Sequence, residues 1–195
     1  MANSDRPAGL KPYKGVQRRD SLILVPIDLD YGTNIFIQDA VMLIADHGIV
    51  QLAASDDAIC GVALEFFDNN FKPILYYKAA DYTAGTGLQC YALVCTDSQQ
   101  RYIIQDDGAG SPTYSTIGNN ADIVVGTGSS SSGVSAMEIN GATLATTAAL
   151  HLKIWGFERR TDNVIGDYCD WVVTLNQFQF PQCTATSFAV GGAGI

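Results

Sequence analysis

Short apolar stretches alternate with turn-forming residues from residue 21 to residue 180. Apolar and β-branched residues dominate the segments 21–29, 34–45, 49–53, 58–67, 74–80, 88–95, 101–107, 121–126, 137–145, 150–157 and 170–180. Clusters of Asp, Asn, Gly and Ser separate many of these segments, and none of them shows the periodicity of a long amphipathic helix. The pattern predicts an all-β protein, an antiparallel β-barrel or sandwich of about ten short strands.

Finer signals lie inside some of these segments. Pro26 predicts an edge strand or a bulge, and the Asn140-Gly141 pair predicts a two-residue hairpin. Residues 150–157 alternate, which assigns His151 to a surface or interface position opposite the apolar stripe. In residues 170–180, Trp171, Val173 and Leu175 share one face while Phe178 and Phe180 fall on the other. A bulge near residues 176–177 would turn both sets inward.

The composition agrees with a β-protein and excludes several classes. The chain has 195 residues, 47% of them hydrophobic and only 16% charged, and Glu and Lys, both strong helix formers, are scarce. The apolar content is too high for a disordered chain. A net charge of −9 disfavours nonspecific nucleic-acid binding. No apolar run approaches the roughly 20 residues of a membrane span, and no leader is expected, so we expect synthesis in the host cytoplasm.

Charge is unevenly distributed along the chain. Residues 1–20 contain five basic and two acidic side chains, a net of +3 that leaves −12 for the other 175 residues. The basic side chains are Arg6, Lys11, Lys14, Arg18 and Arg19. We expect residues 1–20 to be a basic extended N-terminal arm that orders on a partner, with a frayed terminus as the alternative. Residues 21–180 would be the β-body, and residues 181–195 a C-terminal arm of small residues.

Five cysteines, Cys60, Cys90, Cys95, Cys169 and Cys183, leave two interpretations open. No CxxC pair occurs, and the spacing of Cys90 and Cys95 matches no common zinc framework. The thiols are either small apolar core residues or partners in one or more disulfides, within or between chains, formed after release into an oxidising medium.

The sequence offers no catalytic constellation. His47 falls at a predicted turn, no HExxH or GxSxG motif occurs, and the Gly-rich segment 126–133 lacks the Lys-Ser/Thr ending of a phosphate-binding loop. Asp28, Asp30 and Asp39 could gather around Ca²⁺, but no spacing rule supports such a site. We therefore expect no enzyme, no metal and no cofactor.

Seven segments carry a resemblance to a known family. They are MANSDRPAGLKP (1–12), NIFIQDAV (34–41), DAICGVALEF (57–66), YYKAA (76–80), YALVCTD (91–97), YIIQDDG (102–108) and residues 119–180. The last contains Arg-x-Asp-Asn-x-Ile-Gly at 160–166 and Trp-x-Val-x-x-Asn at 171–176. Together these segments resemble small virion structural proteins of tailed bacteriophages, although the five cysteines depart from the family pattern.

The resemblance implies a capsid decoration (cement) protein on the capsid exterior of the virion. Such a protein binds the outside of the expanded head and clamps adjacent major capsid protein subunits, as a homotrimer or a dimer, without direct contact with nucleic acid or membrane. The five basic residues of the arm would contact the capsid, and the aromatic residues Trp155, Phe157, Phe178 and Phe180 would lie at an interface or in the core. Alternatives are another virion part (head-fibre base, minor capsid or tail-associated protein) or a carbohydrate- or cell-surface-binding β-module that uses Tyr76, Tyr77 and Trp155.

Overall fold

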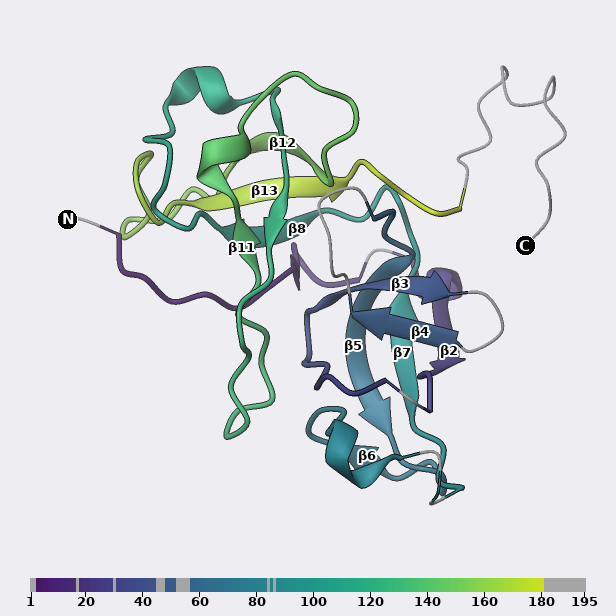
Figure 1. The fold of residues 1–195 in the computed structure, drawn as a ribbon. Helices are drawn as coiled ribbons and strands as arrows, with labels where there is room; N and C mark the ends of the chain where they lie inside the picture. The colour runs from purple at the N-terminus through teal and green to yellow at the C-terminus, as the bar shows by residue number, and fades with distance from the viewer. Residues whose placement is uncertain are drawn as a thin grey trace, which may run out of the picture.

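The computed structural model describes residues 3–16, 18–29, 31–44, 48–51, 57–83, 85 and 87–180. Within these residues there are thirteen short strands in antiparallel sheets and four single-turn 3₁₀ helices (Figure 1). The predicted all-β class is confirmed. The two large sheets pack against each other in a sandwich-like arrangement, and the described strands form no closed barrel.

Two large sheets and one small one make up the molecule. The five-stranded sheet, in the order β1-β8-β13-β12-β9, comprises β1 (Lys11–Pro12), β8 (Tyr102–Gln105), β13 (Asp170–Leu175), β12 (Leu152–Phe157) and β9 (Asn120–Ala121). The six-stranded sheet comprises β2 (Leu22–Pro26), β7 (Tyr91–Cys95), β5 (Gly61–Phe67), β3 (Ala40–Ile44) and β4 (Gly48–Gln51) in that order, with β6 (Pro73–Ile74) paired to β5. A two-stranded ladder joins β10 (Ile123–Val124) to β11 (Glu138–Ile139). The 3₁₀ helices are η1 (Arg19–Ser21), η2 (Ala79–Asp81), η4 (Tyr114–Thr116) and η5 (Gly141–Thr143).

The hydrophobic residues form two clusters. One lies within the six-stranded sheet, which curls until Ile27, just after β2, forms a bridge with Ile49 of β4. The other lies between the two large sheets, where Ala40 and Val62 pack with the inward residues of β8, β12 and β13. The predicted inward face of residues 170–175 is confirmed, because Trp171, Val173 and Leu175 are all buried in this second cluster. β2 lies at one end of the strand order, which accommodates Pro26.

The N-terminal segment lies against the body instead of standing away from it. Lys11 and Pro12 pair with β8, and Tyr13 N donates a hydrogen bond to Arg101 O at 2.8 Å. Leu10 is completely buried in the cluster between the sheets, and its N–H donates to Gln38 O at 2.9 Å. The segment is extended, as its Pro and Gly content predicts, and part of it belongs to the core.

One local prediction is wrong, and another is supported. Residues 140–141 form no hairpin, because the Asn140 side chain accepts a hydrogen bond from Ala142 N at 3.1 Å and starts η5. Gly141 is needed there for close packing, since a Cβ would meet Ala109 O at 1.8 Å. Residues 176–177 carry the hydrogen-bond pattern of the predicted bulge, because Asn176 N and Gln177 N both donate to His151 O, at 2.7 Å and 3.3 Å. β13 ends at Leu175, and Phe178 forms a bridge with Ile59 beside the other sheet.

His151 is fully buried, not at the surface as the alternation predicts. It precedes β12, so the strand alternation does not extend to it. Its Nδ1 lies 3.2 Å from Ile123 N and 3.4 Å from the carboxylate Oδ1 of Asp122. The ring therefore fills a polar position between β10 and the start of β12. His47 and Asp30 lie outside the described residues.

Three acidic side chains are buried or half-buried, and their pKa values rise. Burial raises the pKa of Asp39 to about 6, although its Oδ2 accepts hydrogen bonds from Phe36 N at 2.8 Å and Gln51 Nε2 at 2.7 Å. Burial raises the pKa of Asp106 to about 6 as well. It also raises that of Glu138 to about 7, with further contributions from nearby carboxylates.

These shifts predict that the protein is more stable in mild acid than at neutral pH. A carboxyl with a raised folded-state pKa binds protons more tightly when folded, so its contribution is present at low pH and is lost as the pH rises from about 4 to about 7. For Asp39 alone, the free energy of unfolding is expected to fall by about 1 kcal/mol between pH 5 and pH 7.5. Urea unfolding at both pH values measures this. Asp39→Asn is expected to reduce the difference, and an unchanged pH dependence in this variant would contradict the assignment.

Candidate functional site

The outer face of the five-stranded sheet carries a group of exposed basic side chains among the described residues. Its inward side chains, such as Tyr102 and Ile104, belong to the core, so Arg101, Ile103 and Gln105 lie on the opposite face. Two adjoining pockets lie on this side, and five of the eleven basic residues of the chain line them. We refer to the exposed residues Arg6, Lys11, Arg101, Arg159 and Arg160 as the basic face.

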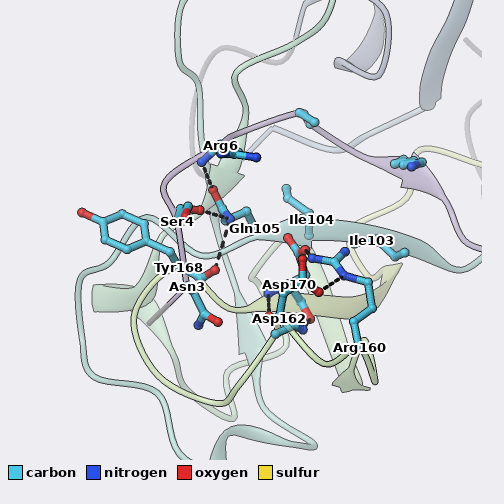
Figure 2. Close-up of a pocket in the computed structure, with 14 residues that line it drawn as sticks. Asn3, Ser4, Arg6, Ile103, Ile104, Gln105, Arg160, Asp162, Tyr168 and Asp170 are labelled. Atoms are coloured by element: carbon cyan, nitrogen blue, oxygen red, sulfur yellow. Dashed lines mark hydrogen bonds and ion pairs between the residues drawn. The ribbon is translucent and has the colours of Figure 1, made fainter. Parts of the chain in front are cut away.

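The first pocket, here the N-terminal pocket, has a volume of about 350 Å³ and lies between the N-terminal segment, β8 and the loop that leads into β13 (Figure 2). Gln105 holds its walls together. The side-chain nitrogen of Gln105 donates to Ser4 O at 3.0 Å and to Tyr168 O at 3.1 Å, and its oxygen accepts from Arg6 N at 2.6 Å. One buried amide therefore fixes the N-terminal segment against both the sheet and the loop.

Asn3 adds a second connection at the outer end of this pocket. Its side-chain nitrogen donates to Val164 O at 2.7 Å and Asp167 O at 2.8 Å, and its side-chain oxygen accepts from Val164 N at 3.0 Å. Three hydrogen bonds from one side chain give the segment a defined path over a loop more than 160 residues away in sequence. The pocket is therefore built by the fold and is not a gap beside a loose end.

Charge in the N-terminal pocket is only partly compensated. Arg160 forms ion pairs with Asp170 at 2.8 Å and Asp162 at 3.0 Å, and its hydrogen bond lowers the pKa of Asp162. Arg6 and Lys11 form no ion pair with any other described residue. Positive charge at this edge of the sheet is thus available to an external partner.

The second pocket, here the aromatic pocket, has a volume of about 250 Å³. It is lined by Tyr13, Arg101, Ile117, Trp155, Gly156, Phe157, Arg159 and Val172. A register shift in β12 between Ile154 and Gly156 lies at Trp155, whose side chain is 53% exposed. The indole N–H of Trp155 donates to Thr174 Oγ1 at 2.9 Å, and the guanidinium of Arg101 lies over the ring, 5.7 Å from its centroid.

Phe157 connects the aromatic pocket to the core. Tyr114, which is 74% exposed, meets Phe157 edge-on with ring centroids 6.2 Å apart. Phe157 in turn meets the buried Trp171 edge-on at 6.5 Å. Of the aromatic residues predicted at an interface or in the core, Trp155 is thus a surface residue and Phe157 is half-buried.

The structure only partly gathers the predicted basic residues. Arg6 and Lys11 line the N-terminal pocket, and Lys14 lies 5.1 Å from the ring centroid of Tyr13, at the aromatic pocket. Arg18 forms an exposed ion pair with Asp20 at 3.6 Å. Arg19 begins η1, and its side chain lies outside what the structure describes.

Sequence reasoning missed three members of the basic face: Arg101, Arg159 and Arg160. The adjacent pair Arg159-Arg160 just after a predicted strand was the available signal, because adjacent basic residues are rare in this acidic chain. Tyr13 also had no signal in the sequence, because the pocket that it lines exists only when residues from distant segments come together.

The remaining predicted residues lie elsewhere or are buried. Phe178 packs against the core and meets Phe180 edge-on at 5.7 Å, away from both pockets. Cys60, Cys90, Cys95 and Cys169 are buried free thiols, and burial raises the pKa of Cys60, Cys90 and Cys169 to about 12. These four behave as apolar core residues, whereas Cys183 and the predicted C-terminal arm lie outside the described residues.

Comparisons with known proteins found no match for this chain. No family model, no curated protein and no solved structure matches the chain. In the described part of the chain, no three His, Cys, Asp or Glu side chains are grouped so that they could hold a metal ion. None of the described helices has the length and apolar character to cross a membrane. The basic face, with its exposed arginines and the indole of Trp155, is the candidate site.

Proposed function

We propose that this protein is a phage capsid decoration protein that docks through its basic face onto an acidic surface of the major capsid protein. The observation that carries the proposal is the segregation of charge. A chain of net charge −9 places five of its eleven basic side chains, and only two acidic ones (Asp162 and Asp170), around two adjoining pockets on one side of one sheet, a local net charge of +3. A concentrated positive face on an acidic protein favours one orientation toward an acidic partner and opposes others.

The shape of the molecule supports this role. The N-terminal segment joins the two sheets through Leu10 and also carries Arg6 and Lys11 of the basic face. Force applied at the face is therefore transmitted to the core. A protein that binds a capsid lattice needs a rigid body that makes the same weak contacts at many positions. Many weak contacts together, and not one strong site, then hold it in place. The resemblance of seven sequence segments to tailed-phage virion proteins points to the same class.

The carbohydrate-binding alternative has less support from the surface. Tyr77 is only 1% exposed, and Tyr76 stacks on Phe36 with ring centroids 4.9 Å apart. Trp155 remains exposed, but the guanidinium of Arg101 lies over its ring, where a sugar would stack. We therefore favour a charged protein partner over a neutral glycan.

Charge reversal on the basic face tests the proposal. Arg6→Glu with Lys11→Glu is expected to weaken binding to expanded heads by about tenfold or more, because both side chains are exposed and available to a partner. Co-sedimentation with purified heads that lack the protein measures this. Lys72→Glu with Lys78→Glu is the matched control, since it makes the same change of net charge at exposed positions outside both pockets.

Two results would contradict the proposal. One is equal affinity of the two double variants for heads, which would show that the basic face is not part of the interface. The other is no binding of heads by the wild-type protein. Copy number per particle, measured by quantitative mass spectrometry, separates the alternatives within the virion. Hundreds of copies are expected for a decoration protein, whereas a few copies would indicate a head-fibre base, minor capsid or tail-associated protein.

A further inference from the structure

The aromatic pocket has a different chemistry from the rest of the basic face. It combines two arginines with an exposed indole, a half-buried phenyl ring and the aliphatic side chain of Ile117, which is 40% exposed. Tryptophan, tyrosine and arginine are the residues that contribute most to binding at protein interfaces. The pocket therefore has the composition of an anchoring site and not of a merely solvated surface.

Arg101 is held in a defined position. Its carbonyl oxygen accepts hydrogen bonds from Tyr13 N at 2.8 Å and Gln100 Nε2 at 2.7 Å, which fixes its backbone. Its guanidinium lies over Trp155, and Trp155 is itself oriented by the hydrogen bond to Thr174. A cation–π contact engages no hydrogen-bond acceptor, so the guanidinium N–H groups can still donate to a partner.

Neither Arg101 nor Arg159 forms an ion pair with any other described residue, although the chain has 20 acidic side chains. Arg160, by contrast, is held by two carboxylates in the neighbouring pocket. The aromatic pocket thus presents two uncompensated guanidinium groups beside an apolar wall. A planar carboxylate is the group that such a fork binds best, through two parallel hydrogen bonds.

We propose that the aromatic pocket binds an acidic peptide segment of the capsid partner, placing an Asp or Glu carboxylate on Arg101 and Arg159. The large apolar residue next to that acid packs against Trp155 and Ile117. A neutral sugar fits less well because it offers no negative charge to the two guanidinium groups, and a nucleic acid is opposed by the net charge of −9. This inference rests on the proposed function and assigns to this pocket the specificity of docking.

Peptide binding tests the inference directly. Overlapping 15-residue peptides that cover the major capsid protein, immobilised on a surface, are probed with the wild-type protein and with Arg101→Gln, Arg159→Gln and Lys72→Gln. We expect the wild type to bind peptides with an acid beside a large apolar residue. Each arginine variant is expected to lose about tenfold in affinity, and Lys72→Gln none. Replacing the acid by its amide in the peptide is expected to cause a similar loss.

A lysine variant tests whether Arg101 binds the carboxylate through two parallel hydrogen bonds or only through its charge. Head-binding assays distinguish failure of this inference from failure of the proposed function. Arg101→Lys keeps the charge but not the planar fork, so an affinity equal to that of the wild type would overturn bidentate binding. Head binding by Arg101→Gln with Arg159→Gln at wild-type strength would overturn this inference alone, whereas failure of the wild type on heads would overturn the proposed function. Arginine-dependent binding of sialylated glycans in place of peptides would likewise overturn the peptide assignment.

Discussion

Deletion of residues 1–14 is expected to lower the free energy of unfolding by about 3–6 kcal/mol. The deletion removes Leu10 from the cluster between the sheets, and loss of a fully buried leucine side chain costs about 2–5 kcal/mol. It also removes β1 from the edge of β8 and leaves the buried side chain of Gln105 without the partners that Ser4 and Arg6 provide. Urea unfolding followed by tryptophan fluorescence measures the change.

Two point variants show which part of the segment is responsible. Leu10→Ala alone is expected to cost about 2–4 kcal/mol, while Arg6→Gln with Lys11→Gln is expected to change stability by less than about 0.5 kcal/mol, since both are exposed. A truncated protein with the unfolding midpoint of the full chain would show that the segment contributes nothing to the core. The practical consequence is that the docking role of this segment has to be tested by charge substitution and not by truncation.

Trp171→Ala is expected to cost about 3–5 kcal/mol, a large part of the 5–15 kcal/mol that typically stabilises a domain. Trp171 is fully buried in β13, its ring meets Phe157 edge-on, and its backbone pairs with Ile104 on one side and Phe157 on the other. Removing the indole leaves a cavity beneath the aromatic pocket, which the packed strands on both sides can fill only in part. The same unfolding experiment measures the loss.

Two controls distinguish packing from other effects. Trp171→Phe keeps an aromatic ring and removes an indole N–H that has no acceptor among the described residues, so we expect a cost below about 2 kcal/mol. Thr174→Ala changes the opposite face of the same strand and is expected to cost about 1 kcal/mol or less. A loss for Trp171→Ala no larger than that for Thr174→Ala would contradict the central position of the indole in the core.

The fold was more predictable than the site. Alternation within 170–175 correctly assigned the inward face of β13, because each side chain of a strand faces opposite to its neighbours whatever the rest of the chain does. The same rule failed at His151, which lies before the strand begins. Where a strand begins or ends depends on the contacts of the adjoining segment, and the local alternation of apolar and polar residues carries no information about those contacts.

At the candidate site, the sequence indicated some residues but not their neighbours. Arg6 and Lys11 were expected to contact the capsid, and Trp155 and Phe157 to lie at an interface or in the core; all four line the two pockets. Arg101 could not be expected there, because its position over Trp155 depends on pairing of β8 with β13 and of β13 with β12. No feature near Arg101 in the sequence records that pairing.

By itself, the sequence determined the all-β class and the separation of a basic first segment from an acidic remainder. Both are properties of local composition and alternation, which act over a few residues. Only the tertiary structure decided that Leu10 is a core residue and that the arginines from three distant segments share one face with Trp155. Those results depend on contacts between segments far apart in sequence, and their pairing is selected by the packing of the whole core.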